Sequence, residues 1–351
     1  MRIRNMINSL SLNNFTAFRE LNLQCSNGIN VFVGANSTGK SHILKLMYAL
    51  CSANKPVEAK INADPARYIS EKLNGVFKPE ARIGRLCRDE AKKANIRANF
   101  ETLKIIEFAL SSDMDEIIVT ENQSYAKYSS VPVFIPPKEM LSIFEGFSSL
   151  YLKRELIIDE TYFDLSQAIE TPKLKETPSE LISLLLNKIK KTCEGEFLLM
   201  KQKKFYYKPI KGKILEVELA AEGFRKLGML QRLLQSGHIL PGVSGPLFWD
   251  EPESNLNPSL MKQLVGIMLE LARNGQQIFL ATHDYIILKW FDLLKKSNDN
   301  ILFHTLFKNS EGEIELNSTD DYLKIHPNAI DDTYAELIDK DIEHSMGGLG
   351  K

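Results

Sequence analysis

An eight-residue loop with the sequence GANSTGKS, residues 34–41, constrains the fold of this chain more than any other segment. It follows an apolar run, Ile29–Val33, and precedes a segment with helical apolar spacing, residues 42–47. Loops of this pattern, between a strand and a helix, bind the phosphates of a nucleotide through backbone N–H groups. The order of strand, glycine loop and helix therefore predicts an α/β protein with a P-loop nucleotide site.

The chemistry of the loop assigns roles to its residues. The lysine of such a loop reaches the β- and γ-phosphates and the next hydroxyl binds Mg²⁺, which makes Lys40 a catalytic candidate and Ser41 a metal ligand. Glycine is needed where the backbone turns tightly and approaches the phosphates without a Cβ atom. The nucleotide-binding residues expected from the pattern are Gly34, Asn36, Ser37, Thr38, Gly39, Lys40 and Ser41.

Two later apolar runs end in polar residues that suit the same site. Residues 247–249 are followed by Asp250 and Glu251, the form of a Walker B element, in which the aspartate holds Mg²⁺ and the glutamate orients or deprotonates the attacking water. Residues 278–281 lead to His283, which we expect one strand over, in contact with the γ-phosphate. ATP and Mg²⁺ are therefore the expected ligands.

Composition adds expectations about location rather than chemistry. The net charge of −1 provides no global basic field for nucleic acid. The four cysteines have no C-x-x-C spacing that would suggest a zinc or redox motif. No run of about 18 apolar residues occurs, and the N-terminal residues lack the apolar core of a signal peptide. We therefore expect a soluble, cytoplasmic protein with no membrane partner.

Apolar periodicity and turn residues organise the rest of the chain. Two strands are expected before residue 29, and the polar residues 51–94 read as an exposed or loosely packed excursion. A list of the remaining expected elements comprises strands at 98–110, 116–120 and 131–135, helices at 140–151, 161–170 and 179–193, an antiparallel meander at 197–219, helices at 222–236 and 258–274, and an acidic, helix-prone tail after Ser318.

Together these motifs resemble those of the ABC-type ATPases of the SMC, RecF and OLD group, and among them the compact bacterial AAA-family ATPases of phage-defence systems (PtuA-like or AriA-like). The matching segments are Asn14-Phe15, GANSTGKS, residues 221–228, WDEPESNLNP at 249–258 and ATHD at 281–284. The resemblance implies an α/β P-loop NTPase of ABC-ATPase head type, with a mixed sheet core, an antiparallel β lobe and an inserted helical lobe.

The resemblance also implies a division of the chain into domains. The ATPase core would comprise residues 1–50 and 196–318, which carry the P-loop, signature, Walker B and histidine motifs. Residues 51–195 would form an inserted strand and helical lobe, and residues 319–351 a C-terminal helical tail.

In this family two ATPase heads sandwich two nucleotides, each P-loop facing the signature helix of the other subunit. The resemblance implies that Gly223 and neighbouring N–H groups cap the γ-phosphate in a partner head, and that residues 254–257 form a loop crossing the dimer interface. Ala221 departs from the common Leu-Ser-Gly-Gly pattern, because it stands where a serine hydroxyl would contact phosphate. Arg225 or Lys226 could supply charge to the phosphate instead.

The segment around residues 133–141 falls where the family places its Q-loop, although it has no glutamine at the strand end. Lys138 and Glu139 are candidates for sensing the nucleotide, and the alternative is a Pro-terminated strand followed by a charged helix start. Phe15 and Phe18 lie near the expected adenine edge, but aromatic residues in such strands are more often part of the core.

The function implied is an ATP-hydrolysing switch, in which ATP closes a homodimer of heads, or a higher oligomer, and hydrolysis reopens it. The family suggests a role in bacterial antiviral defence with a separately encoded effector such as a nuclease. The alternative is a RecF-like repair clamp that binds DNA. Its only support is a cluster of basic residues, which is either a phosphate-binding surface or a solvated helix end and hairpin edge. The cluster comprises Lys188, Lys190, Lys191, Lys201, Lys203 and Lys204.

Overall fold

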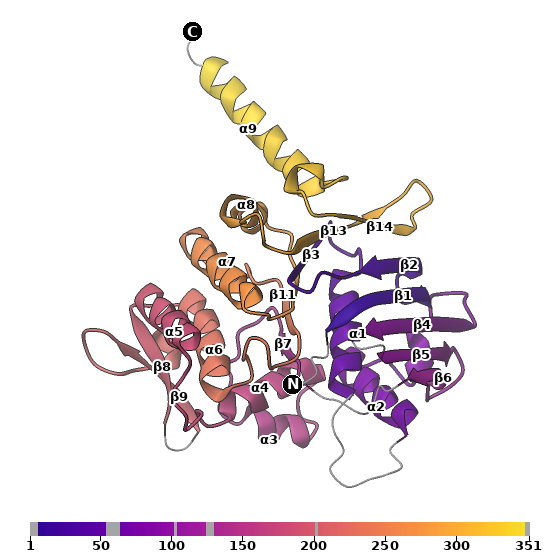
Figure 1. Cartoon of the computed structure of the whole chain (residues 1–351), viewed down its shortest axis with the longest axis horizontal. Coiled ribbons are helices and arrows are strands. Elements are labelled where there is room, and N and C mark those ends of the chain that lie inside the picture. Colours follow the sequence, from indigo (N-terminus) through magenta and orange to yellow (C-terminus); the bar gives the residue numbers. More distant parts are fainter. Residues whose placement is uncertain (1–5, 54–63, 102–103, 124–129, 201–202, 348–351) are drawn as a thin grey trace.

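Three β-sheets organise the structure, a computed structural model that describes residues 6–53, 64–101, 104–123, 130–200 and 203–347 (Figure 1). The central sheet has the order β14-β13-β3-β12-β11-β7, and all its strands are parallel except β14. Its strands are β3 (Ile29–Val33), β7 (Val133–Ile135), β11 (Leu247–Asp250), β12 (Ile278–Ala281), β13 (Ile301–Lys308) and β14 (Ile314–Thr319).

The two other sheets are antiparallel. The larger one has the order β2-β1-β4-β5-β6, and the smaller one has the order β10-β9-β8. Their strands are β1 (Ile7–Phe15), β2 (Phe18–Gln24), β4 (Lys93–Phe100), β5 (Lys104–Ser111), β6 (Ile118–Gln123), β8 (Gly195–Met200), β9 (Lys204–Pro209) and β10 (Leu215–Glu216).

Side chains of the central sheet alternate between two apolar cores, as the two-residue period of a strand requires. Val31 and Trp249 enter one core, while Phe32 and Phe248 enter the other. The first core lies under α3 (Phe147–Leu152), α4 (Glu160–Glu170), α5 (Glu180–Thr192), α6 (Glu222–Ser236), α7 (Pro258–Arg273) and α8 (Tyr285–Leu294). The second lies between the sheet, α1 (Lys40–Ala53), α2 (Pro65–Phe77) and the larger antiparallel sheet.

This arrangement confirms the α/β fold class with a mixed central sheet, and it corrects three element predictions. The strand predicted at 98–110 is wrong, because β4 and β5 pair as a hairpin in which Asn99 lies opposite Ile105. The residues between 51 and 94 are not all loosely packed, since α2 buries Ile69 and Leu73. Asp64 caps this helix by accepting the N–H of Ala66.

The helix predicted at 140–151 is also wrong for its first half. The Glu139 carboxylate accepts the N–H groups of Leu141 and Ser142, so that a capped turn replaces helical hydrogen bonds there. Gly146 then adopts a left-handed backbone with φ of 75°. Only α3, from Phe147, is helical.

Residues 51–195 do not form one contiguous layer. Their strands β4–β6 complete the sheet that starts with β1, and β7 forms one edge of the central sheet. Strand pairing therefore links this segment to both larger sheets, while the division of the chain into core, inserted lobe and tail stays a prediction. Within the described ranges, no helix combines the length and apolar character needed to cross a bilayer.

Arg232 of α6 joins two helices of the first core, and its removal should destabilise the fold. Its guanidinium is 2% exposed and donates to the carbonyls of Ile169 and Thr171 at the end of α4, at distances of 2.9–3.2 Å. We expect Arg232→Met to lower the free energy of unfolding by about 3 kcal/mol, because it leaves buried carbonyls unpaired. Urea unfolding measures this, with Arg19→Met as the control, because Arg19 is an exposed residue of β2. A loss below about 0.5 kcal/mol would contradict the role.

Candidate nucleotide site

The motif residues follow three neighbouring strands at one edge of the central sheet. The P-loop comes after β3, His283 after β12, and Asp250 ends β11. β12 pairs with both β3 and β11 in parallel register, so the carboxyl ends of all three strands meet at this edge. Ligands of open parallel sheets bind at such an edge. The predicted placement of the histidine one strand from the Walker B element is confirmed.

The backbone of the P-loop can be formed only with glycine at its two ends. Gly34 has φ of 146°, and a Cβ atom there would lie 2.2 Å from the carbonyl oxygen of Leu306. Gly39 has φ of 87°, and a Cβ atom would lie 2.4 Å from the ring of Phe18. Between them Asn36 and Ser37 are exposed. Both glycines are therefore fixed by close contacts, and Asn36 and Ser37 between them face solvent.

Two further contacts fix the shape of the P-loop from within. Thr38 Oγ1 donates to the carbonyl of Ala35 at 2.9 Å. Lys40 Nζ donates to the carbonyls of Gly34 and Ala35, at 2.7 Å and 2.9 Å. Burial lowers the pKa of Lys40, and the nearby carboxylates of Asp250 and Glu251 oppose this shift. Lys40 is 8% exposed, and its ammonium lies inside the loop, where bound phosphate oxygens would accept its hydrogen bonds.

Ser41 and Asp250 provide the oxygens that Mg²⁺ prefers. Ser41 Oγ donates to Asp250 Oδ1 at 3.0 Å, and this contact joins the start of α1 to the end of β11. Burial raises the pKa of Asp250 to about 6, and the Ser41 hydrogen bond opposes the rise. A hydroxyl and a carboxylate this close can both bind one hard cation, so the residues fit the expected magnesium site.

Glu251 and His283 lie side by side beyond the Ser41–Asp250 pair. Glu251 has φ of 47°, a left-handed conformation that is uncommon for a residue with a side chain. Its Oε2 accepts the Ser254 hydroxyl proton at 2.9 Å, and its Oε1 lies 3.8 Å from His283 Nδ1. The left-handed backbone therefore holds a partly exposed carboxylate between Ser254 and His283, directly after Asp250 in the chain.

Glu253 is a functional candidate that the sequence analysis gave no role. It is 6% exposed, and its Oε1 accepts protons from Thr282 Oγ1 at 2.8 Å and from the N–H of His283 at 2.9 Å. Burial raises its pKa. Within the described ranges its Oε2 has no hydrogen-bond partner. Glu253 therefore fastens the histidine loop to the Walker B turn. A third acid in the run D-E-P-E was the available signal.

Gly223 is the second residue of α6. This helix packs in the first core, whereas α1, which follows the P-loop, packs in the second core on the other face of the central sheet. Ala221 is the N-cap of α6 and forms no side-chain cap. A Cβ atom at Gly223 would lie 3.1 Å from Leu260 and 3.2 Å from Leu256, so the helix start packs tightly on the segment after Glu251.

The expectation that Arg225 or Lys226 reaches a partner's phosphate does not fit their contacts. Arg225 Nε pairs with Glu139 at 2.8 Å, and its Nη1 donates to the carbonyl of Ala220 at 2.6 Å. Lys226 is 2% exposed and donates to backbone carbonyls of its own chain. Both cations are therefore held inside the head. The Arg225–Glu139 ion pair also connects the expected Q-loop position, at Glu139, to α6.

The other candidates of the sequence analysis are placed as follows. Phe15 and Phe18 are fully buried in the second core, so they belong to the core rather than to an adenine site. Lys138, after β7, lies next to the buried Glu139. The role of Lys138 stays a prediction.

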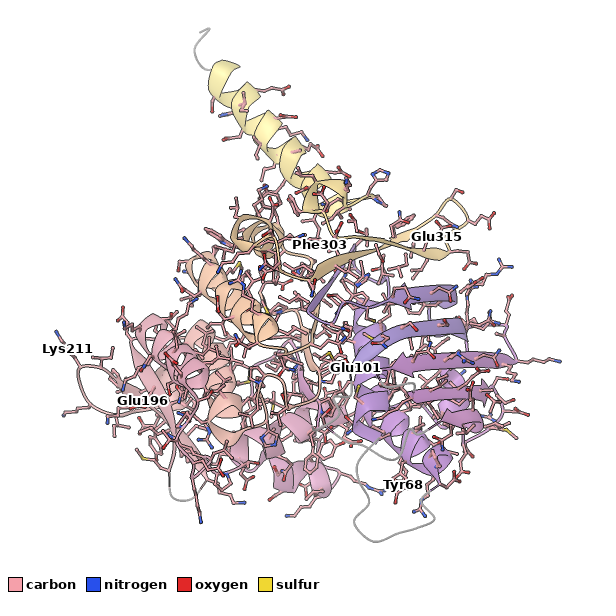
Figure 2. The ribbon with its side chains drawn as sticks, in the orientation of Figure 1. Tyr68, Glu101, Glu196, Lys211, Phe303 and Glu315 are labelled. Atoms are coloured by element: carbon pink, nitrogen blue, oxygen red, sulfur yellow. The ribbon has the colours of Figure 1, made fainter. Side chains whose placement is uncertain are left out.

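Three lysines of the predicted basic cluster form ion pairs. Lys203 pairs with Glu170, Lys204 with Glu145, and Lys190 with Glu196. Lys201 lies outside the described residues. Lys211, in the turn after β9, projects from the surface (Figure 2).

Comparisons with known proteins agree with this geometry. A family model described as "AAA domain, putative AbiEii toxin, Type IV TA system" matches residues 29–289. The fold is similar to that of an SMC head bound to the C-winged helix domain of ScpA, with a TM-score of 0.57 and 15% identity over 91% of this chain and 100% of that one. It is also similar to a Pyrococcus furiosus Smc head with an extended coiled coil bound to the C-terminal domain of ScpA.

For the Pyrococcus furiosus Smc head the TM-score is 0.51, and the identity is 14% over 90% of this chain and 96% of that one. No curated protein sequence matches. These likenesses confirm the predicted ABC-ATPase head fold.

Proposed function

The chain belongs to the AAA domain family whose model it matches, and from that premise we propose that it binds ATP with Mg²⁺ and hydrolyses it. The observation that carries the proposal is the 3.0 Å contact between Ser41 Oγ and Asp250 Oδ1, with Glu251 and His283 beside it. Lys40, Ser41 and Asp250 would hold the phosphates and the metal. Bound Mg²⁺ supplies neutralisation of the charge that develops on the phosphate oxygens.

The residues around this pair have separable roles in hydrolysis. Glu251 orients the attacking water and accepts its proton, while Ser254 fixes one carboxylate oxygen. His283, held by Glu253 through its backbone N–H, contacts the γ-phosphate. Lys40 stabilises negative charge on the β- and γ-phosphate oxygens. Phosphoryl transfer requires positioning and electrostatic stabilisation more than covalent chemistry, and these groups supply both.

The proposed consequence of nucleotide binding is the closing of two heads. Because α6 packs in the first core and α1, which follows the P-loop, packs in the second, we infer that a complete nucleotide sandwich takes its α6 from a second copy. ATP binding closes this homodimer and hydrolysis reopens it. The matched family is described by a toxin of a toxin–antitoxin system. We propose that this switch acts in antiviral defence with a separately encoded effector, as the motif resemblance implies.

The test is steady-state ATP hydrolysis by the purified chain, measured with Mg²⁺, with excess EDTA, and with duplex DNA at low salt. We expect turnover that EDTA abolishes, because Ser41 and Asp250 act through the metal. We expect DNA to leave the rate unchanged, because ion pairs already occupy Lys190, Lys203 and Lys204. Absence of Mg²⁺-dependent turnover would refute the proposal, and stimulation by DNA would favour a repair clamp.

A further inference from the structure

Lys226 connects the signature helix to the turn that carries Glu251. It is the fifth residue of α6, and its side chain is buried against the segment after β11. Its Nζ donates to the carbonyl of Glu251 at 3.0 Å and to the carbonyl of Ser254 at 2.8 Å. A single ammonium thus holds both ends of a four-residue turn that belongs to another part of the sequence.

The turn that Lys226 holds is strained and carries the proposed catalytic carboxylate. Glu251 has a left-handed backbone, and its carbonyl also accepts the N–H of Ser254 at 3.1 Å. The Ser254 hydroxyl fixes the Glu251 side chain at 2.9 Å. A left-handed residue with a side chain persists only where surrounding contacts determine it. The position of the Glu251 carboxylate therefore depends on the turn, and the turn depends on Lys226.

Other contacts make the start of α6 and this turn a single unit. Glu222 Oε1 accepts the side-chain amide of Asn255 at 2.9 Å. A Cβ atom at Gly223 would lie only 3.1 Å from Leu260 Cδ1 and 3.2 Å from Leu256 Cδ1, so the helix start is in close contact with the segment after the turn. These contacts provide a path by which a displacement of the helix start would reach the segment 251–256.

Lys226 is buried, which disfavours its charged form, but nearby carboxylates favour that form. Burial lowers its pKa to about 8, and the carboxylates of Glu253, Glu222, Glu251 and Glu139 oppose that shift. A buried cation that made only local contacts would be replaceable by an apolar side chain of similar length. Here the ammonium satisfies two carbonyls of the catalytic turn, which an apolar side chain cannot do.

We propose that Lys226 is a positioning residue that transmits engagement of the signature helix by a partner head's nucleotide to the Glu251 turn of its own head. This inference rests on the proposed dimeric ATPase. It makes hydrolysis at the two sites of a dimer interdependent, because each head's Glu251 is set by the nucleotide in the other head. Each site still binds ATP, and the contact regulates only the rate at which that ATP is hydrolysed.

The experiment compares wild type, Lys226→Met, Lys226→Gln and the control Lys262→Met for ATP dependence of turnover and binding of a fluorescent ATP analogue. Lys262 is an exposed lysine of α7 whose ammonium lies over the Trp290 ring. We expect a Hill coefficient of about 1.5–2 for wild type and Lys262→Met, and of about 1 for Lys226→Met. We also expect kcat of Lys226→Met to fall about tenfold or more, with nucleotide affinity within about threefold of wild type.

Lys226→Gln retains one donor, so it should fold even if Lys226→Met does not, and it should give an intermediate kcat with a reduced Hill coefficient. A merely structural role would lower the melting temperature without selectively removing cooperativity. The inference is overturned if wild type hydrolyses ATP without cooperativity, or if a folded Lys226 variant keeps it. Either result leaves the ATPase proposal standing, whereas an inactive wild type would refute the ATPase itself.

Discussion

Replacing Glu251 by glutamine should lower kcat for ATP about a thousandfold while leaving nucleotide affinity within about threefold of wild type. The amide keeps the size of the side chain and can still accept the Ser254 hydroxyl proton, so the strained turn is preserved. It can neither accept a proton from water nor provide the same negative charge. The loss should therefore fall on the chemical step, which single-turnover hydrolysis measures directly.

A matched control is Glu216→Gln, which neutralises an exposed carboxylate on β10 and should leave kcat unchanged. Because Glu251→Gln binds ATP without hydrolysing it, its molar mass in Mg²⁺-ATP should shift from monomer to dimer and remain shifted for hours. The same turnover in Glu251→Gln and in wild type would show that another group activates the water. Hydrolysis lost without an ATP-dependent change in mass would remove the dimer from the proposal.

The second large effect is expected at Lys40. We expect Lys40→Met to weaken ATP binding about 100-fold and to abolish measurable turnover, because the ammonium lies inside the loop, where it would meet the β- and γ-phosphates. Equilibrium titration with a fluorescent ATP analogue measures the affinity. The variant should also fail to dimerise in ATP, in contrast to Glu251→Gln.

Lys45→Met is the matched control for this substitution. Lys45 lies on the same helix and pairs with Asp159 at 2.9 Å, so its loss should change affinity by less than about threefold. If Lys40→Met bound ATP as tightly as wild type, the nucleotide would have to bind elsewhere. Equal weakening in both variants would indicate a general effect of charge in α1 rather than a specific phosphate contact.

Much of the site could be predicted because its motifs are local in sequence. The loop from Gly34 to Ser41 encodes its own backbone requirements, and Asp250 and Glu251 directly follow a buried strand. Parallel pairing then brings those strand ends together without further information. The identities of the P-loop, the Walker B element and the histidine loop therefore needed only patterns of about ten residues.

The remainder depends on contacts between distant segments, which no local pattern encodes. Lys226 has the appearance of a solvated charge on an amphipathic helix, and only the fold places it over the turn at Glu251. The role of Glu253 cannot be predicted from the sequence, because its partners Thr282 and His283 follow a different strand, β12. The hairpin of β4 and β5 resembles one strand in sequence because both arms have apolar alternation and only three residues separate them.

The strand order of the central sheet has a consequence for synthesis of the chain. β3, which leads into the P-loop, is flanked by β12 and β13, so it must wait for roughly 250 further residues before either neighbour leaves the ribosome. At about 5–20 residues per second this delay is on the order of tens of seconds. During it, an apolar strand without its sheet is exposed to chaperones. A nascent chain interrupted before β12 would lack the strand that lies between β3 and β11, so its P-loop and Asp250 would not yet be held together.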